Sequence, residues 1–270
     1  MNFKTNESAG EKFSVKPSTP LPKGKRVFDI ACGVIALPIL AVFTLFMTIL
    51  MRVTSPGPVF FCQERVGYLG RRFRCYKFRT MTVGADTSVH QAHCEKLIDS
   101  NAPMVKMDAR GDSRLIPLGW LVRASGIDEL PQLINVLRGE MSLVGPRPCV
   151  PYEYEKYQPW QRERFSTLPG LTGLWQVSGK NRTTFEQMIR LDIYYAQNKS
   201  LLMDAKIIVS TVPALIMQVV ETRLRSKSPN QSPATTAVWS AVPFPMKTET
   251  RRPFPTMQDK SANLVREGQS

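Results

Sequence analysis

The chain has 270 residues, with 36 lysines and arginines against 22 aspartates and glutamates, and a formal net charge of +14. This length suits one large domain or two small ones. The excess of positive charge indicates an anionic partner, whether nucleic acid, an acidic membrane surface or a phosphorylated substrate. The five cysteines are odd in number and form no Cys-x-x-Cys pair, which argues against a disulfide framework and agrees with a reducing compartment.

Both ends of the chain are rich in Pro, Ser, Thr and Lys and lack a sustained apolar period. Such segments bury too little apolar surface to offset the entropy of ordering. We therefore expect a disordered basic segment over residues 1–24 and a disordered tail over residues 226–270. About 200 residues remain between them, enough for a real core.

Residues 30–51 form a run of 22 residues without a charge. As one helix the run would reach about 33 Å, enough to cross a bilayer core. Basic residues flank it on both sides: Lys23, Lys25 and Arg26 before it, and Arg52, Arg65, Arg71, Arg72, Arg74, Lys77 and Arg79 after it. Positive charge marks the cytoplasmic side, so a run that is basic at both ends conflicts with a simple span. Pro38 supplies a bend, and the residues leave open a re-entrant helix or a kinked spanning one.

Downstream, aromatic and β-branched residues at 59–63 and 72–78, joined by a glycine-containing stretch, predict a β-hairpin. Helices are expected over residues 83–101 and from Ser125 to Leu137, with Asp128 as capping-box partner of Ser125. A second capping box, Thr183 with Glu186, opens a helix that ends near Gln197.

The last expected element covers residues 203–224. It places Ile208, Val212, Leu215 and Val219 on one side and is interrupted by Pro213. Two interpretations stay open, a helix in the membrane interface or a helix packed on the core. Together these elements predict an α+β fold that is mainly helical, with a membrane helix over 25–54 and a catalytic domain over 55–225.

The strongest candidate for chemistry is the pair Asp128 and Glu129 at an expected helix start. Free N–H groups and the helix dipole favour negative charge there. A carboxylate that stays ionised suits a nucleophile or a Mg²⁺ ligand. Acidic first turns are also commonplace, so the pair alone does not establish a site.

Two further groups of residues are weaker candidates. Arg147 lies between two prolines, with Arg123 upstream, and a guanidinium on a restricted backbone suits phosphate oxygens; a rigid surface turn is the plain alternative. Residues 169–182 combine glycines, Trp175, Lys180 and Arg182, which suits either a nucleotide pocket or a tight turn with a buried tryptophan. The group His90, His93 and Cys94 lacks the second ligand cluster that a metal site needs.

Taken together, seven ordered blocks resemble the monotopic phosphoglycosyl transferases, the bacterial polyprenyl-phosphate sugar-phosphate transferases. The blocks are residues 25–29, 55–61, 76–81, 128–133, 141–148, 169–182 and 191–195. The resemblance covers about residues 25–220, and seven blocks in order are far more specific than any one of them.

The resemblance implies an enzyme that transfers a sugar-1-phosphate from a UDP-sugar to polyprenyl (undecaprenyl) phosphate and releases UMP, at the start of exopolysaccharide or other glycoconjugate synthesis. It implies Asp128 as nucleophile, and Asp128 and Glu129 as ligands of a Mg²⁺ cofactor. Arg79, Arg123, Arg147, Lys180 and Arg182 are the implied substrate-binding residues.

The resemblance also implies a re-entrant helix in the bacterial inner membrane, with a catalytic domain that faces the cytoplasm, carries interfacial amphipathic helices and binds no nucleic acid. The sequence departs from the family pattern twice. Ala41-Val42 stands where a Ser-Pro break is common, so the bend is displaced to Pro38 or shallower. Gly126 stands where serine is common, which alters the cap before the nucleophile.

Two competing functions remain: a catalytically silent membrane scaffold for polysaccharide assembly, and a basic nucleic-acid-binding protein. The intact Asp128–Glu129 pair speaks against the first, and the uncharged run speaks against the second. The sugar, the final polymer, the oligomeric state and any role of the tail are left open.

Overall fold

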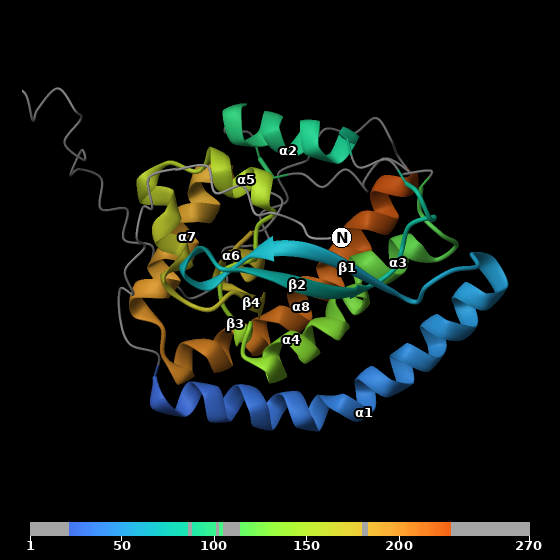
Figure 1. The fold of residues 1–270 in the computed structure, drawn as a ribbon, viewed down its shortest axis with the longest axis horizontal. Coiled ribbons are helices and arrows are strands. Elements are labelled where there is room, and N and C mark those ends of the chain that lie inside the picture. Colours follow the sequence, from blue (N-terminus) through green and yellow to red (C-terminus); the bar gives the residue numbers. More distant parts are fainter. Residues whose placement is uncertain (1–21, 86–87, 101–102, 105–113, 180–182, 228–270) are drawn as a thin grey trace, which may run out of the picture. The chain divides into compact units, whose positions relative to one another are not determined.

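The structure, a computed structural model, describes residues 22–85, 88–100, 103–104, 114–179 and 183–227, all in one compact unit. Helices dominate this unit (Figure 1). The described strands form one antiparallel hairpin and one short parallel ladder. The predicted mainly helical fold with a small hairpin is thereby confirmed.

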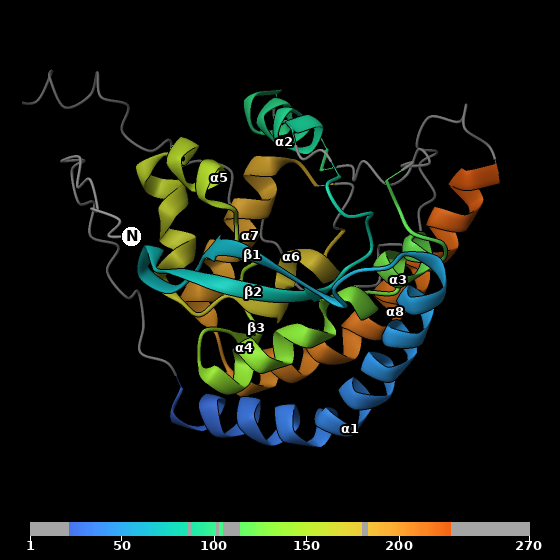
Figure 2. The ribbon, with the colours of Figure 1, turned by 45° about the vertical axis from the view of Figure 1, so that its right-hand side comes forward.

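Helix α1, Lys23–Thr54, contains the whole uncharged run. It bends partway along, as Figures 1 and 2 show, and Pro38 lies near its middle. Proline removes one backbone hydrogen bond and crowds the preceding turn, which accounts for a bend in an otherwise continuous helix. One side of α1 contacts η3, Ile127–Gln132; α4, Leu133–Arg138; and β3, Ser142–Val144. Its other side exposes apolar residues along its length: Val27, Ile30, Val34, Ile35, Leu37, Ile39, Val42, Leu45, Phe46, Ile49 and Val53.

The predicted hairpin is confirmed: strand β1, Phe60–Val66, pairs antiparallel with β2, Arg72–Phe78. A short 3₁₀ turn, η1, Tyr68–Gly70, lies between the strands. Figures 1 and 2 show the hairpin between α2, Ser88–Ser100, and α4, Leu133–Arg138. The last residue of β1, Val66, also bridges to Cys149, which ties the hairpin to the centre of the unit.

The helix predicted from Ser125 to Leu137 is present in outline, but its start is wrong. Helix α3, Gly119–Ala124, has Ser125 as its C-cap, and the Ser125 hydroxyl donates back to the Leu121 carbonyl at 2.8 Å. The residue that precedes the next helical run is Gly126, which has no side chain to cap that run. The next helical run begins at Ile127 as the 3₁₀ segment η3, Ile127–Gln132, and continues as α4. Pro131 has no N–H to donate, so the first part of the run lacks regular α-helical hydrogen bonding.

The C-terminal half is built from α5, Pro151–Lys156; η4, Pro159–Ser166; α6, Leu174–Val177; α7, Phe185–Asn198; and α8, Leu201–Lys227. The predicted capping box at Thr183 and Glu186 is off by one residue. Thr184 caps α7, accepting from the Gln187 N–H, and the Gln187 side chain accepts from the Thr184 N–H in return.

Helix α8 runs through Pro213 without ending, contrary to the predicted interruption. Its inner side is buried at Met203, Asp204, Ile207 and Gln218, and its outer side exposes Val209, Val212, Ile216 and Val220. The four residues predicted to share one side of this helix lie between its buried and exposed sides: Val212 is exposed, and Ile208, Leu215 and Val219 are half-buried. Packing on the core is confirmed, because α8 contacts α3, α6, β3 and β4, Gly170–Thr172. The interpretation as a membrane-interface helix stays a prediction, with which the apolar outer side agrees.

At the centre, strand β3, Ser142–Val144, lies parallel to β4, Gly170–Thr172. The two backbones approach closely where Gly145, just after β3, lies against Gly170 of β4. A Cβ at Gly145 would lie 2.2 Å from the Leu168 carbonyl oxygen, and one at Gly170 would lie 2.0 Å from the Gly145 nitrogen. Only glycine fits at either position.

We predict that Gly145→Ala destabilises the protein by about 3 kcal/mol or more, because rigid backbone atoms must move apart to admit the methyl group. Gly24→Ala is the matched control, since its methyl group would meet only the flexible tip of Leu201. Chemical unfolding in detergent measures both variants. Equal stabilities of the two variants would contradict the packing argument.

Candidate active site

Asp128 and Glu129 lie in the first turn of η3, which begins directly after Gly126. Gly126 adopts φ +74°, a left-handed conformation in which other residues are strained. Glycine in place of the serine common in the family therefore suits the turn that this chain makes. Both carboxylates are half-buried, so they stand at the edge of the core where a ligand has access.

Two cations from separate elements converge on Glu129. Lys77 of β2 places Nζ 2.9 Å from Oε1, and Arg147 places a guanidinium nitrogen 3.0 Å from the same oxygen. The Glu129 carboxylate raises the pKa of Arg147, outweighing the opposite effect of burial, and Asp128 adds to the rise. The carboxylate pair is thus framed by fixed positive charge.

Lys77 is held in place through Asn135, which is fully buried in α4. The Asn135 side chain accepts from the Tyr76 N–H at 3.2 Å and donates to the Arg74 carbonyl at 2.7 Å. An amide that bonds both kinds of backbone group fixes the strand in register with the helix. The hairpin and the helical run that carries Glu129 are locked together beside the site.

Arg147 is held through its own backbone. Arg164 of η4, which is 2% exposed, donates to the Arg147 carbonyl at 2.9 Å. The same guanidinium pairs with Asp192 of α7 at 2.5 Å and donates to the Tyr157 hydroxyl at 2.8 Å. The Asp192 of the last family block is therefore part of the support of Arg147.

The other predicted binding residues lie as follows. Arg79 is buried and uses three nitrogens on the loop after α1, at Ser55 and Pro58. These contacts assign it to holding that loop, and its binding role stays a prediction that none of them supports. Arg123 lies in the last turn of α3, shortly before Gly126, and is half-buried. Lys180 and Arg182 fall outside the described residues.

The glycine-rich block has the plainer of its two interpretations within the described part. Trp175 is buried and its indole N–H donates to Thr183 at 2.6 Å, so its ring is a core element. Gly170 and Gly173 bring backbone against backbone, because a Cβ at Gly173 would lie 2.3 Å from the Gly145 oxygen. The expected stacking face is not presented by this tryptophan.

The donors at the site are those that Mg²⁺ takes in phosphate-binding enzymes, where one or two carboxylates act together with substrate oxygens. Asp128 and Glu129 fit that requirement, and Lys77 and Arg147 share Glu129 with any such ion. Among the residues whose side chains are described, no group of three or more His, Cys, Asp or Glu gathers as a metal site. His90 is outside that set, so its group gains no support.

The structure thus combines an acidic pair, two cations that contact Glu129, and a long apolar helix. The chain belongs to the bacterial sugar transferase family, whose profile matches residues 22–218. The predicted membership among polyprenyl-phosphate sugar-phosphate transferases is confirmed, and the protein is a phosphoglycosyl transferase.

Individual relatives agree. The galactosyl transferase CpsE of Streptococcus agalactiae is 41% identical over 194 residues, 72% of this chain and 42% of the relative. Exopolysaccharide production protein ExoY of Sinorhizobium fredii is 36% identical over 193 residues, 72% of this chain and 85% of the relative. A UDP-glucose:undecaprenyl-phosphate glucose-1-phosphate transferase of Caulobacter vibrioides is 38% identical over 216 residues, 75% of each. The chain thus spans less than half of CpsE and most of the other two.

Sequence reasoning missed Lys77, Asn135 and Arg164 as parts of the site. Alternation along β2 is the signal that was available for Lys77, because it shares a strand face with buried Cys75. The sequence gives no such signal for Arg164, because an arginine in a polar stretch is expected to be solvated. Only the fold brings Asp192 and Tyr157 next to it.

We predict that Arg164→Met destabilises the protein by about 3–5 kcal/mol, because Asp192 is left as an unpaired buried charge. The double variant Arg164→Met/Asp192→Leu should recover most of that stability. Its transferase activity should stay low, since nothing then holds the Arg147 carbonyl. Unfolding curves and turnover are measured on the same preparations, and full recovery of both would contradict a role for Arg164 in placing Arg147.

Proposed function

We propose that the protein transfers a sugar-1-phosphate from a UDP-sugar to undecaprenyl or a related polyprenyl phosphate, through a phosphosugar intermediate on Asp128. The observation that carries the proposal is the Asp128–Glu129 pair with Lys77 and Arg147 on Glu129. Relatives named for glucose and galactose transfer to undecaprenyl phosphate support the two substrate classes.

In the first step an oxygen of Asp128 attacks the phosphorus that bears the sugar. The bond from that phosphorus to the bridging oxygen breaks, and UMP leaves with the electron pair. Covalent catalysis divides one transfer between two bulky anions into two easier displacements. Arg147 and Lys77 are placed to offset charge on the diphosphate as it approaches two carboxylates.

In the second step a phosphate oxygen of the lipid attacks the same phosphorus. The bond to Asp128 breaks, the carboxylate is restored, and a polyprenyl-diphosphate sugar is formed. A Mg²⁺ ion held by Asp128 and Glu129 would neutralise diphosphate charge when bound. Glu129, already fixed by two cations, keeps its orientation through both steps.

We further infer that α1 enters the membrane and returns to the same side. Its first turns are bound to the unit through Lys25 and Asp204, and the loop after it is bound through Ser55 and Arg79. A helix whose two ends are tied to one polar unit does not place them on opposite sides of an apolar layer about 30 Å thick. The exposed apolar sides of α1 and α8 supply the contact with lipid.

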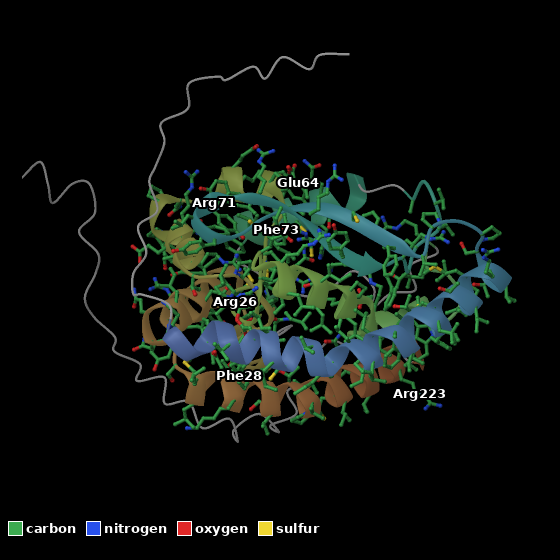
Figure 3. The ribbon with its side chains drawn as sticks, turned by 60° about the horizontal axis from the view of Figure 1, so that its bottom comes forward. Arg26, Phe28, Glu64, Arg71, Phe73 and Arg223 are labelled. Atoms are coloured by element: carbon green, nitrogen blue, oxygen red, sulfur yellow. The ribbon has the colours of Figure 1, made fainter. Side chains whose placement is uncertain are left out.

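Arg26, labelled in Figure 3, shows how one of the charges beside the apolar run is used. Arg26 lies on the part of α1 that faces the rest of the unit, where its guanidinium donates to the Val136 and Leu137 carbonyls at the end of α4. Arg26, one of the basic residues that flank the apolar run, therefore binds the carbonyl end of the protein's own helix α4. Tethering of both helix ends, more than the flanking charge, argues for the return.

The covalent step is tested by omitting the lipid. With Mg²⁺ and a panel of UDP-sugars, the protein should release UMP up to about one equivalent and keep the sugar phosphate after denaturation. Asp128→Asn should abolish both signals, and Glu129→Gln should lower turnover severely. Arg147→Lys keeps the charge but loses the planar fork, so it should weaken use of the donor.

Thermal unfolding of each variant is the control for folding. Release of UMP only when polyprenyl phosphate is present, with no labelled protein, would replace the intermediate by direct transfer in a ternary complex. Asp128 would then be a metal ligand.

Topology is tested by single cysteines at Gly24 and Pro56, both exposed, in a variant whose five native cysteines are replaced. Both positions should resist an impermeant thiol reagent in intact cells and react after permeabilisation. Reaction of one position alone in intact cells would establish a full span.

A further inference from the structure

Lys25, in the first turn of α1, is completely buried although it begins an apolar helix. Its side chain is 2% exposed, and its Nζ lies 2.6 Å from Asp204 of α8, 3.1 Å from the Val144 carbonyl and 3.2 Å from the Tyr195 hydroxyl. An ammonium group has three protons, and these three acceptors use all of them. Lys25 is thus a fixed internal cation.

The Tyr195 hydroxyl completes the cluster. It lies 2.7 Å from the second oxygen of Asp204 and 2.9 Å from the Val144 carbonyl. Its single proton serves one of these acceptors at a time, so the ammonium of Lys25 is the constant donor to Val144. The cluster ties α1, α7 and α8 to the end of β3.

One turn further along α1, Asp29 binds the same strand. Its carboxylate, 1% exposed, accepts from the Leu143 N–H at 3.1 Å. Lys25 and Asp29 are four residues apart and therefore lie on one face of the helix. Together they bind an N–H and a C=O of β3, so the start of α1 supplies hydrogen bonds to a strand whose other neighbour is β4.

We infer that Lys25 is a positioning residue for Arg147, and that the first turns of α1 are part of the catalytic unit as well as of the membrane helix. The connection is short: Lys25 fixes Val144, Gly145 and Pro146 follow in a backbone restrained by glycine packing and a proline ring, and Arg147 reaches Glu129. The inference rests on the proposed function only for the reaction in which its effect is measured.

A purely structural role would give a different pattern of kinetics. If Lys25 acts through Arg147, its loss matters only while Arg147 is present. If Lys25 only stabilises the fold, its effect on turnover adds to that of any site variant, because independent effects are additive. A double-mutant cycle separates the two cases.

Initial rates of UMP release are measured against donor concentration for Lys25→Met, Arg147→Ala and the double variant. Lys25→Met should lower kcat/KM up to about 100-fold, the effect of a small misplacement of a reacting group. In the Arg147→Ala background the same change should have little further effect. Lys156→Met, which breaks only the outlying pair with Glu95, is the matched control and should leave kcat/KM unchanged.

Tyr195→Phe, which loses one hydroxyl and keeps the ring, provides a milder version of the same test. It should show a smaller loss that is likewise absent in the Arg147→Ala background. Additive losses for both changes, or full kcat/KM in Lys25→Met, would overturn the inference.

A second measurement does not depend on activity. Hydrogen exchange is compared between wild type and Lys25→Met at the Leu143 and Gly145 amides. The Leu143 N–H donates to Asp29, and the Gly145 N–H donates to the Thr172 carbonyl. These amides should exchange at least about tenfold faster in the variant, while strand β2, which lies outside the cluster, is unchanged, because opening is local. Unchanged exchange at residues 142–149 would overturn the inference. A wild-type protein that releases no UMP would instead refute the proposed function and leave the exchange result to decide this one.

Discussion

The close contact of β3 with β4 is the constraint on which the site depends. Gly145 and Gly170 bring two backbones together with no space for a side chain, and the chain leaves this contact directly into Pro146 and Arg147. A backbone restrained in this way limits the conformations of the Arg147 side chain, so little conformational entropy remains to be lost when it binds an anion. Glu129, Lys77 and Arg147 then form one charged group from three separate segments.

The two most deeply buried ion pairs of the described residues hold the backbone beside the site. Lys25 with Asp204 and Arg164 with Asp192 are both almost inaccessible, and each pair also binds a carbonyl of the segment from Val144 to Arg147. Buried ion pairs add little net stability compared with apolar packing, but losing one partner is costly. They therefore act here as fixed attachments for one loop, and the family blocks at 25–29 and 191–195 each contribute one residue, Lys25 and Asp192, to these pairs.

Much of this arrangement was predictable from local pattern, and the remainder was not. The apolar helix, the hairpin and the helical run that carries Asp128 follow from uninterrupted hydrophobicity, strand composition and a turn before an acidic pair. Two helix starts were predicted at the wrong residue. The Ser125 hydroxyl bonds back to Leu121 at the end of α3, and Thr184, not Thr183, caps α7. Local sequence does not decide between neighbouring hydroxyls.

Long-range pairing was beyond the pattern. A lysine before an apolar run is typical of a headgroup-facing residue, and only the fold brings Asp204, far along the chain, to Lys25. The glycines of the block at 169–182 suit either a nucleotide pocket or a tight turn, and at Gly170 and Gly173 the space is taken by the Gly145 segment. Close approach was rightly expected, but its partner is another part of the backbone.

The exposed apolar rows of α1 and α8 have a consequence for the proposed encounter with the lipid acceptor. With these rows in lipid, as proposed, enzyme and polyprenyl phosphate share a surface, and their encounter is a search in two dimensions. The relevant acceptor concentration is then a mole fraction among lipids, and diluting the membrane with inert lipid slows the second displacement at constant bulk concentration. The nucleotide sugar arrives from solution, so the rate of the first half-reaction depends on its concentration per volume. The rate of the second half-reaction depends on the mole fraction of polyprenyl phosphate in the membrane.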